Sequence, residues 1–290
     1  MPRGRPAHLR AADRQIDEFG GSRTTIRVVA ADLVAQLGSR ALEPAEVHTE
    51  CELADYLRAL DRPGLDEDLG EVLRRARARR RLDVDRMRAV LAALADPPTA
   101  ELSKARIARA AQMPVTTLGP YVDVLVELGV LVLLPGCRAA VAKRAIGRPQ
   151  AVFTDPALAR HLAGVPTGVL AELAGRSRLA PLLRGVVAVA LLRQQTTSAV
   201  DYRVSHLRER NGLAVDLVVE LPDDGVFGIE VRTAAAVRPH QFAALEALAH
   251  RAGGLFRGGV VLNTARRGHR YGPRLWSLPI AAVGEVARAD

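Results

Sequence analysis

The stretch Asn211–Arg232, NGLAVDLVVELPDDGVFGIEVR, decides the fold of this chain because it predicts a β-hairpin. Its first part, Leu213–Leu221, is rich in the β-branched and apolar residues that strands prefer. The residues PDDG at 222–225 then favour a turn. A second strand is expected over Val226–Val231, so the hairpin forms the centre of a sheet.

Asp216, Glu230 and Arg232 are charged residues within the apolar pattern of this hairpin. Glu230 and Arg232 are separated by one residue, so both face the same side of the sheet. An acid in one strand, then an acid, a spacer and a cation in the next, is the layout of a PD-(D/E)xK nuclease site. In such a site two carboxylates hold Mg²⁺ beside the scissile phosphate, and a lysine helps to activate water.

The last position of this layout is arginine here, and we therefore expect a degenerate site. Asp216 and Glu230 are the only candidate metal ligands, and Mg²⁺ is the one candidate ion; no other cofactor is expected. An alternative is purely structural: Arg232 between two carboxylates would satisfy both by charge-assisted hydrogen bonds without any metal.

Composition indicates a globular chain with an anionic partner. At 290 residues the chain is long enough for two domains. The net charge of +9 favours DNA as a partner, although an arginine- and alanine-rich composition also follows from a GC-rich genome. Aromatic residues make up only 3%, too few for a protein that binds single strands by stacking.

Nothing in the sequence predicts a membrane or secreted location. Cys51 and Cys137 form no metal-binding or disulfide pattern, which favours a reducing compartment. The longest apolar run, Val186–Leu192, is too short to span a bilayer, and MPRGRPAHLR at the start has no apolar segment typical of a signal peptide. We expect a soluble, cytoplasmic protein; the oligomeric state is left open.

We expect four regions along the chain. Residues 1–41 form a basic arm with a short element, in which 26–37 is a strand followed by a helix. Residues 42–100 are helical, with a long stretch over Leu69–Ala95. Residues 101–160 form a winged helix-turn-helix. Residues 161–290 form a restriction-endonuclease-like α/β domain.

The winged helix-turn-helix is predicted from two short helices and a pair of strands. The first helix covers Leu102–Ala111, and Thr116 or Thr117 caps the second, which ends at Gly129. Strands at 130–134 and 151–154 would form the wing. The second helix is the usual DNA reader, but here its only charges are Asp123 and Glu127, which repel phosphate. Packing against protein is therefore the favoured role of this helix.

Arginines elsewhere are candidates for weak, sequence-independent phosphate contacts. A run of this kind is equally compatible with an ordinary solvated helix face. The last members fall in a segment, 266–274, expected to be a basic loop. The candidate DNA-binding residues are Arg74, Arg75, Arg77, Arg79, Arg80, Arg106, Arg144, Arg266, Arg267 and Arg270.

Short motifs in a shared order carry a family resemblance. They include DYLR at 55–58 with PG at 63–64, VFTD at 152–155, VD at 215–216, IEV at 229–231 and LPI at 278–280. Over residues 42–283 the chain resembles the C-terminal half of bacterial and archaeal AAA+-type ATP-binding proteins that end in a domain of unknown function. The resemblance implies a helical segment, a winged helix and a PD-(D/E)xK-like domain.

The chain also departs from that family. No G-x-x-x-x-G-K-[ST] motif occurs, so we expect no ATP binding or hydrolysis. Where the family usually has a helix glutamate, this chain has Ala188, and where it usually has lysine, this chain has Arg232. Both changes point away from catalysis.

Three functions remain open at this stage. The first is a non-catalytic DNA-associated or regulatory protein that keeps both folds as binding surfaces. The second is a Mg²⁺-dependent DNA nuclease using Asp216 and Glu230, with Arg232 clamping the phosphate. The third is a protein-interaction module that serves a separately encoded ATPase.

Overall fold

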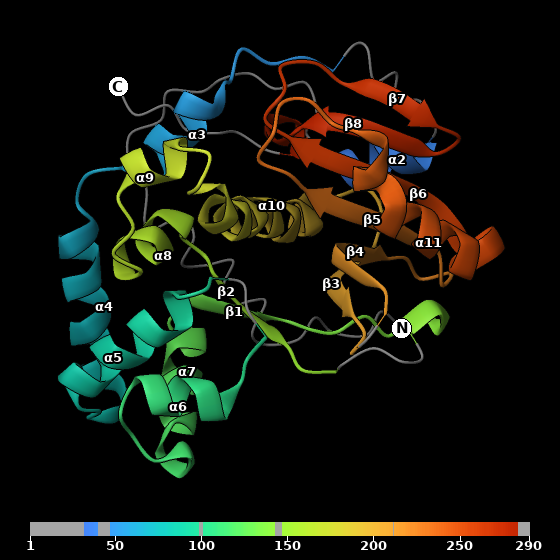
Figure 1. Ribbon diagram of the computed structural model, residues 1–290. Coiled ribbons are helices and arrows are strands. Elements are labelled where there is room, and N and C mark those ends of the chain that lie inside the picture. The colour runs from blue at the N-terminus through green and yellow to red at the C-terminus, as the bar shows by residue number, and fades with distance from the viewer. Residues whose placement is uncertain (1–31, 40–46, 99–100, 143–146, 211, 284–290) are drawn as a thin grey trace.

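A computed structural model describes residues 32–39, 47–98, 101–142, 147–210 and 212–283. It is a mixed α/β structure in which a long helix, α10, separates a group of helices from a six-stranded sheet (Figure 1). The predicted α/β class is confirmed. The α-helices are α2 (Leu33–Ser39), α3 (Leu53–Ala59), α4 (Leu65–Arg80), α5 (Val84–Ala95), α6 (Lys104–Ala110), α7 (Gly119–Glu127), α8 (Pro156–Leu162), α9 (Thr167–Ala171), α10 (Arg176–Thr197) and α11 (Ala243–Ala252). The short 3₁₀ helices are η2 (Val115–Thr117), η3 (Ala140–Ala142), η4 (Pro239–Phe242), η5 (Gly253–Leu255) and η6 (Ile280–Val283).

The large sheet is mixed, with the strand order β3-β4-β5-β6-β8-β7. The first three strands form an antiparallel meander, β6 and β8 then run parallel to β5, and β7 pairs antiparallel with β8. Two further strands, β1 and β2, form a separate antiparallel pair. The strands are β1 (Leu131–Leu134), β2 (Gln150–Phe153), β3 (Arg203–Arg208), β4 (Ala214–Glu220), β5 (Val226–Val231), β6 (Phe256–Asn263), β7 (His269–Gly272) and β8 (Leu275–Pro279).

The hairpin predicted from the central stretch is confirmed as β4 and β5. Leu217 lies opposite Ile229 in an antiparallel register. In the turn, the Leu221 backbone N–H donates to the Gly225 carbonyl at 2.8 Å. Asp224 has a φ of 60°, a left-handed conformation that Asp tolerates better than most residues. The turn chemistry read from PDDG therefore sets the register of the two strands.

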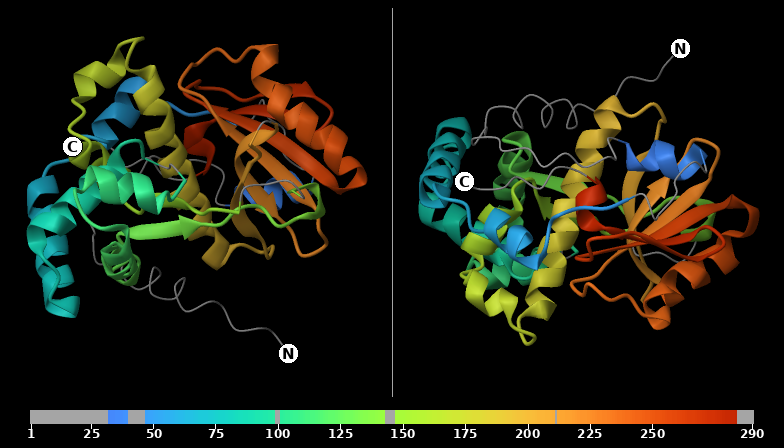
Figure 2. Two further views of the ribbon diagram at one scale, coloured as in Figure 1. Left: turned by 60° about the horizontal axis from the view of Figure 1, so that its bottom comes forward. Right: turned by 90° about the horizontal axis from the view of Figure 1, so that it is seen from above.

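Helices cover both faces of the sheet, α10 on one side and α11 on the other (Figures 1 and 2). Ile229 of β5 belongs to the same buried apolar cluster as Leu183 of α10. On the opposite face a Cβ added at Gly228 would come within 2.6 Å of Leu245 and 2.8 Å of Leu248. Glycine at this position is what allows α11 to lie against the sheet.

One hydrophobic cluster joins the helical half to the α10 face of the sheet, and a second cluster fills the space between the opposite face and α11. Leu91 of α5, Leu125 of α7, Leu183 of α10 and Ile229 of β5 are fully buried members of one cluster. Helix α10 connects them, since it contacts α8 and β2 on one side and β3 and β5 on the other. The helical half and the sheet are therefore packed as one body.

The loop after β1 covers one edge of the large sheet. Gly136 pairs with His206 of β3 in a parallel bridge, and the Cys137 N–H donates to the His206 carbonyl at 2.7 Å. The His206 ring contacts the Arg148 carbonyl oxygen at 2.9 Å, and burial lowers its pKa. An edge strand covered in this way is not open to pairing with another chain.

Several sequence expectations need correction. Thr117 lies in η2, where its hydroxyl donates to the Pro114 carbonyl at 2.8 Å, so neither threonine caps α7. The chain is already helical at Leu118, whereas a side-chain cap needs extended backbone. The expected loop at 266–274 contains β7, whose exposed polar residues lack the apolar alternation that predicts a strand.

Helix α2 confirms the helical part of the element expected at 26–37, whereas its strand part and the basic arm at 1–31 lie outside the described residues. In the described part of the chain no helix combines the length and apolar character needed to cross a membrane.

Candidate functional site

Asp216 and Glu230 meet where β4 and β5 separate. The ladder between these strands ends at the pair Leu217 and Ile229, one residue before the two acids. On its other side β4 carries a bulge against β3. Val215 and Val218 of β4 pair with Leu207 and Ser205 of β3, so β4 has one more residue between the two pairs than β3 has. Bulges re-aim side chains next to functional sites. Asp216 lies within this bulge, so its side chain does not follow the regular alternation of side chains between the two faces of the sheet.

The two carboxylates take the place of the missing ladder bonds. The Asp216 backbone N–H donates to Glu230 Oε1 at 3.2 Å, and the Val231 N–H donates to Asp216 Oδ2 at 3.0 Å. Each acid thus accepts a hydrogen bond from the neighbouring strand. Both side chains are held in position by the backbone of the hairpin itself.

Arg232 lies between the two acids. Its Nη1 is 3.2 Å from Asp216 Oδ2, and its Nη2 forms a close ion pair with Glu230. Nη1 also donates to the Val231 carbonyl at 2.9 Å. Arg232 thus contacts both carboxylates, as the structural alternative read from the sequence expects.

A second arginine, Arg184, was missed by the sequence reasoning. It projects from α10, and its Nη2 lies 2.7 Å from Asp216 Oδ1. One helical turn further on is Ala188, which is fully buried and offers only a methyl group. A signal was present: Arg184 is the only charged residue between Leu179 and Leu192. We refer to Asp216, Glu230, Arg184 and Arg232 as the charge network.

The electrostatics of the charge network are balanced without a metal. Two guanidinium groups face two carboxyl groups, so the formal charges cancel. Glu230 is 3% exposed. Burial is the main cause that raises its pKa to about 7, Asp216 adds to the rise and Arg232 opposes it.

The residues present do not fit Mg²⁺. The ion prefers octahedral oxygen coordination and needs carboxylates that are free to bind it. Here both acids are engaged by arginines and backbone N–H groups, and the helix position that would add a third acid is Ala188. Within the described ranges, no cluster of three or more His, Cys, Asp or Glu side chains could hold a metal.

The candidate DNA-binding arginines do not form one surface. Five lie on α4, whereas the last three lie in or just before β7; Figure 1 places these elements at opposite sides of the molecule. Arg106 donates to the carbonyls of Ala93 at 3.1 Å and Asp96 at 2.9 Å, so it caps α5. Arg144 lies outside the described residues.

Several of the remaining candidate DNA-binding arginines already form ion pairs within the chain. Arg79 and Arg80 both pair with Glu127 of α7, and Arg266 pairs with Glu50 and Glu52. Helix α7 packs against α4 and α5, and it exposes Asp123 rather than a cation. The side of α7 that faces α4 and α5 is therefore occupied by this chain itself.

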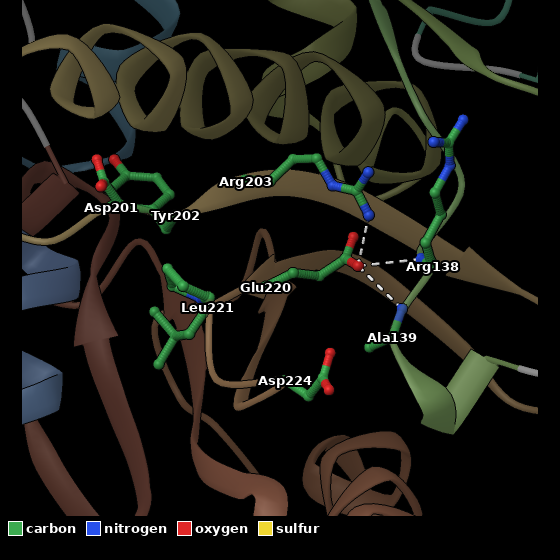
Figure 3. A pocket seen from close by; sticks show the side chains of 9 residues that line it. Arg138, Ala139, Asp201, Tyr202, Arg203, Glu220, Leu221 and Asp224 are labelled. Atoms are coloured by element: carbon green, nitrogen blue, oxygen red, sulfur yellow. Dashed lines mark hydrogen bonds and ion pairs between the residues drawn. The ribbon is translucent and has the colours of Figure 1, made fainter. Parts of the chain in front are cut away.

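A second buried carboxylate, Glu220, holds the loop after β1 against the sheet (Figure 3). Its Oε2 accepts from the Arg138 N–H at 3.0 Å, the Ala139 N–H at 2.9 Å and the Arg203 guanidinium at 2.6 Å. The nearby Cys137 thiol is buried, and burial together with the Glu220 charge raises its pKa to about 11. This thiol is therefore protonated at neutral pH, and Glu220 acts as a clamp between distant segments.

Comparison with known proteins gives two family matches, each to a domain of unknown function. Residues 67–168 match the model of DUF8612, and residues 181–283 match the model of DUF4143. The first match runs from within α4 to the start of α9, and the second runs from within α10 to η6 and includes the charge network. No curated protein and no solved structure matches the chain.

Proposed function

We propose that this chain is a non-catalytic DNA-associated or regulatory protein. In this proposal it is built on a winged helix at 101–160 and a PD-(D/E)xK nuclease-like domain at 161–290 whose site is degenerate. The observation that carries the proposal is the charge network, in which arginines occupy the carboxylates that a nuclease would use for metal. The strand meander, the flanking helices and the place of the acids support the nuclease-like assignment.

Arginine is a poor replacement for lysine in such a site. A lysine ammonium can shift its pKa and take part in proton transfer, whereas a guanidinium stays charged and pairs with carboxylates. Arg232 therefore competes with a metal for Glu230, and Arg184 competes for Asp216 in the same way. Loss of a catalytic acid or base commonly costs about 10²–10⁴-fold in rate, so two faults together should abolish detectable cleavage.

The rest of the molecule supports association with DNA but not reading of its bases. The net charge is +9, and the second helix of the proposed winged helix, α7, has no Lys or Arg. Phosphate contacts give affinity without sequence information. We propose binding that is weak, independent of base sequence and sensitive to salt.

The test is cleavage of plasmid DNA with Mg²⁺ or Mn²⁺. Wild type, Asp216→Ala and the double variant Ala188→Glu with Arg232→Lys are compared, and circular dichroism checks that each is folded. No cutting by the wild type is expected. Robust metal-dependent cutting by the wild type that disappears in Asp216→Ala would overturn the proposal and establish a nuclease.

A further inference from the structure

The C-terminal half of α4 carries an arginine face that is separate from the charge network. Arg74, Arg77 and Arg81 surround Ala78, and these four residues line a shallow hollow. All four are exposed. Residues three and four apart on a helix lie on the same side, so Arg74, Arg77 and Ala78 share one face of α4. Arg81, directly after the helix, completes the lining of the hollow. We call Arg74, Arg77 and Arg81 the α4 arginine face.

The members of this face are available to a partner. Arg74 pairs with Glu71 of the same helix, and both side chains reach solvent. Exposed pairs of this kind are weak and screened by salt. Arg77 and Arg81 form no ion pair with any residue that the structure describes. Their neighbours Arg79 and Arg80 are instead bound to Glu127 of α7, which leaves the hollow to the three arginines of the face.

A role in helix stability does not account for the whole face. Cations in the last turn of a helix interact favourably with its C-terminus. Arg77, Arg79 and Arg80 lie there, so this role covers only Arg77 among the members of the face. Arg74 precedes the last turn, and Arg81 follows α4 in a left-handed conformation with a φ of 51°. The nearby acids Asp83 and Asp85 leave the region from 74 to 88 with a surplus of positive charge.

The chemistry of the face fits a DNA duplex. Residues 74 to 81 span about 10 Å of helix at 1.5 Å per residue, and duplex DNA presents about six phosphate charges over that length. No exposed large apolar residue is present on described α4; Val115, Val169, Leu173 and Tyr271 lie elsewhere. Protein interfaces are anchored mainly by Trp, Tyr and Arg in apolar surroundings, and of these this face offers only arginine; a single strand needs stacking aromatics.

We propose that the α4 arginine face binds the phosphate backbone of duplex DNA without reading its sequence. This inference deepens the proposed DNA association and rests on it. It assigns the contact to α4, away from α7, β7 and the charge network. The hollow over Ala78 would receive a phosphate group flanked by the three guanidinium groups.

The experiment measures binding of the full chain to two unrelated duplexes by fluorescence anisotropy over a range of salt. The variant Arg74→Gln/Arg77→Gln/Arg81→Gln keeps side-chain length, and glutamine has nearly the helix propensity of arginine. The matched control Arg266→Gln/Arg267→Gln/Arg270→Gln removes the same charge at the opposite side of the molecule. The pair Arg77→Gln/Arg81→Gln replaces the triple variant if thermal melting shows that the latter unfolds.

We expect equal binding of both duplexes by the wild type. The α4 variant should bind about 10–100-fold more weakly, with a slope of log K against log salt that is smaller by about 2–3. The control should stay within about threefold of the wild type. This result supports the assignment to α4.

Four results would overturn it, each in a recognisable way. A wild type that binds neither duplex at low salt removes the DNA association together with the inference. Equal losses in both triple variants, or no loss in the α4 variant, remove the inference alone and leave DNA association standing. Competition by polyglutamate as effective as by DNA would indicate an acidic protein as the partner.

Discussion

Two arginine-rich regions of this molecule use the same side chain in opposite ways. In the charge network, Arg184 and Arg232 are held by carboxyl groups that the fold has buried or half-buried. On α4, Arg77 and Arg81 extend into solvent, and no described acid pairs with them. A count of arginines in the sequence does not separate the two cases. What separates them is whether a poorly hydrated carboxylate lies within reach.

The largest effect is expected from removing an arginine of the charge network. Arg232→Ala leaves Glu230, which is 3% exposed, beside Asp216 without its nearest cation. Removing one partner of a buried pair leaves an uncompensated charge, and we expect a loss of about 3 kcal/mol in unfolding free energy at about pH 8. Urea unfolding measures it. The control Arg77→Ala should change stability by less than about 0.5 kcal/mol. Equally small effects of Arg232→Ala and Arg77→Ala would contradict the difference drawn between the charge network and α4.

The second prediction concerns pH and Glu230. Its folded-state pKa is raised to about 7 from an ordinary value of 4.5, so between these values the folded state holds a proton that the unfolded state has released. This contribution to stability is present below the unfolded pKa and is lost as the pH rises through the folded pKa. We expect the free energy of unfolding to fall by about 2–3 kcal/mol as the pH rises from the unfolded pKa to the folded pKa of Glu230.

Urea unfolding at several pH values checks this prediction, with Glu230→Gln as the control. The variant cannot titrate at this position, so its stability should decline less between about pH 5 and pH 8 than that of the wild type. Parallel curves for the two proteins would show that Glu230 titrates normally in the folded state.

A third prediction extends the comparison to Glu220, another buried carboxylate paired with an arginine. Glu220→Gln removes the charge of the carboxylate that accepts hydrogen bonds from the Arg138 and Ala139 N–H groups. We expect the free energy of unfolding to fall by about 1–2 kcal/mol. Hydrogen exchange at those two amides should then speed up about tenfold. The control Asp223→Asn changes an exposed acid of the β4–β5 turn and should leave those amides unchanged. Unchanged exchange in Glu220→Gln would show that the loop needs no clamp.

The smallest effect is expected on α4. Arg77→Gln with Arg81→Gln removes two exposed charges that form no ion pair with a described residue. The free energy of unfolding should therefore change by less than about 0.5 kcal/mol. Thermal melting at low and moderate salt measures it. A larger loss of stability would mean that the α4 arginine face belongs to the fold rather than to a partner.

Much of the sheet was predictable because its signals are local. Val226–Val231 matches β5 over its full length, and the other central strand differs by one residue at each end. The strand β7 was not predictable, because an exposed edge strand of polar residues has no apolar alternation. The cap expected at the threonines failed because a 3₁₀ turn leads directly into α7.

The site was predictable only in part. Asp216, Glu230 and Arg232 lie in one hairpin, so period-two alternation and one turn bring them together. Arg184 lies on a helix far from them in sequence, and its contact depends on how α10 packs against the sheet. The bulge that re-aims Asp216 depends on pairing with β3, which no local pattern reveals.

The sequence by itself determined the α/β class, the central hairpin and the grouping of two acids with one arginine. These follow from interactions between residues close along the chain, where propensity, turn chemistry and alternation act directly. The tertiary structure alone decided that a second arginine closes the charge network, that Glu220 clamps a distant loop, and that the candidate DNA contacts lie on separate faces. These depend on packing between elements far apart in sequence, because an ion pair forms only where folding brings opposite charges within a few ångströms and withdraws them from water.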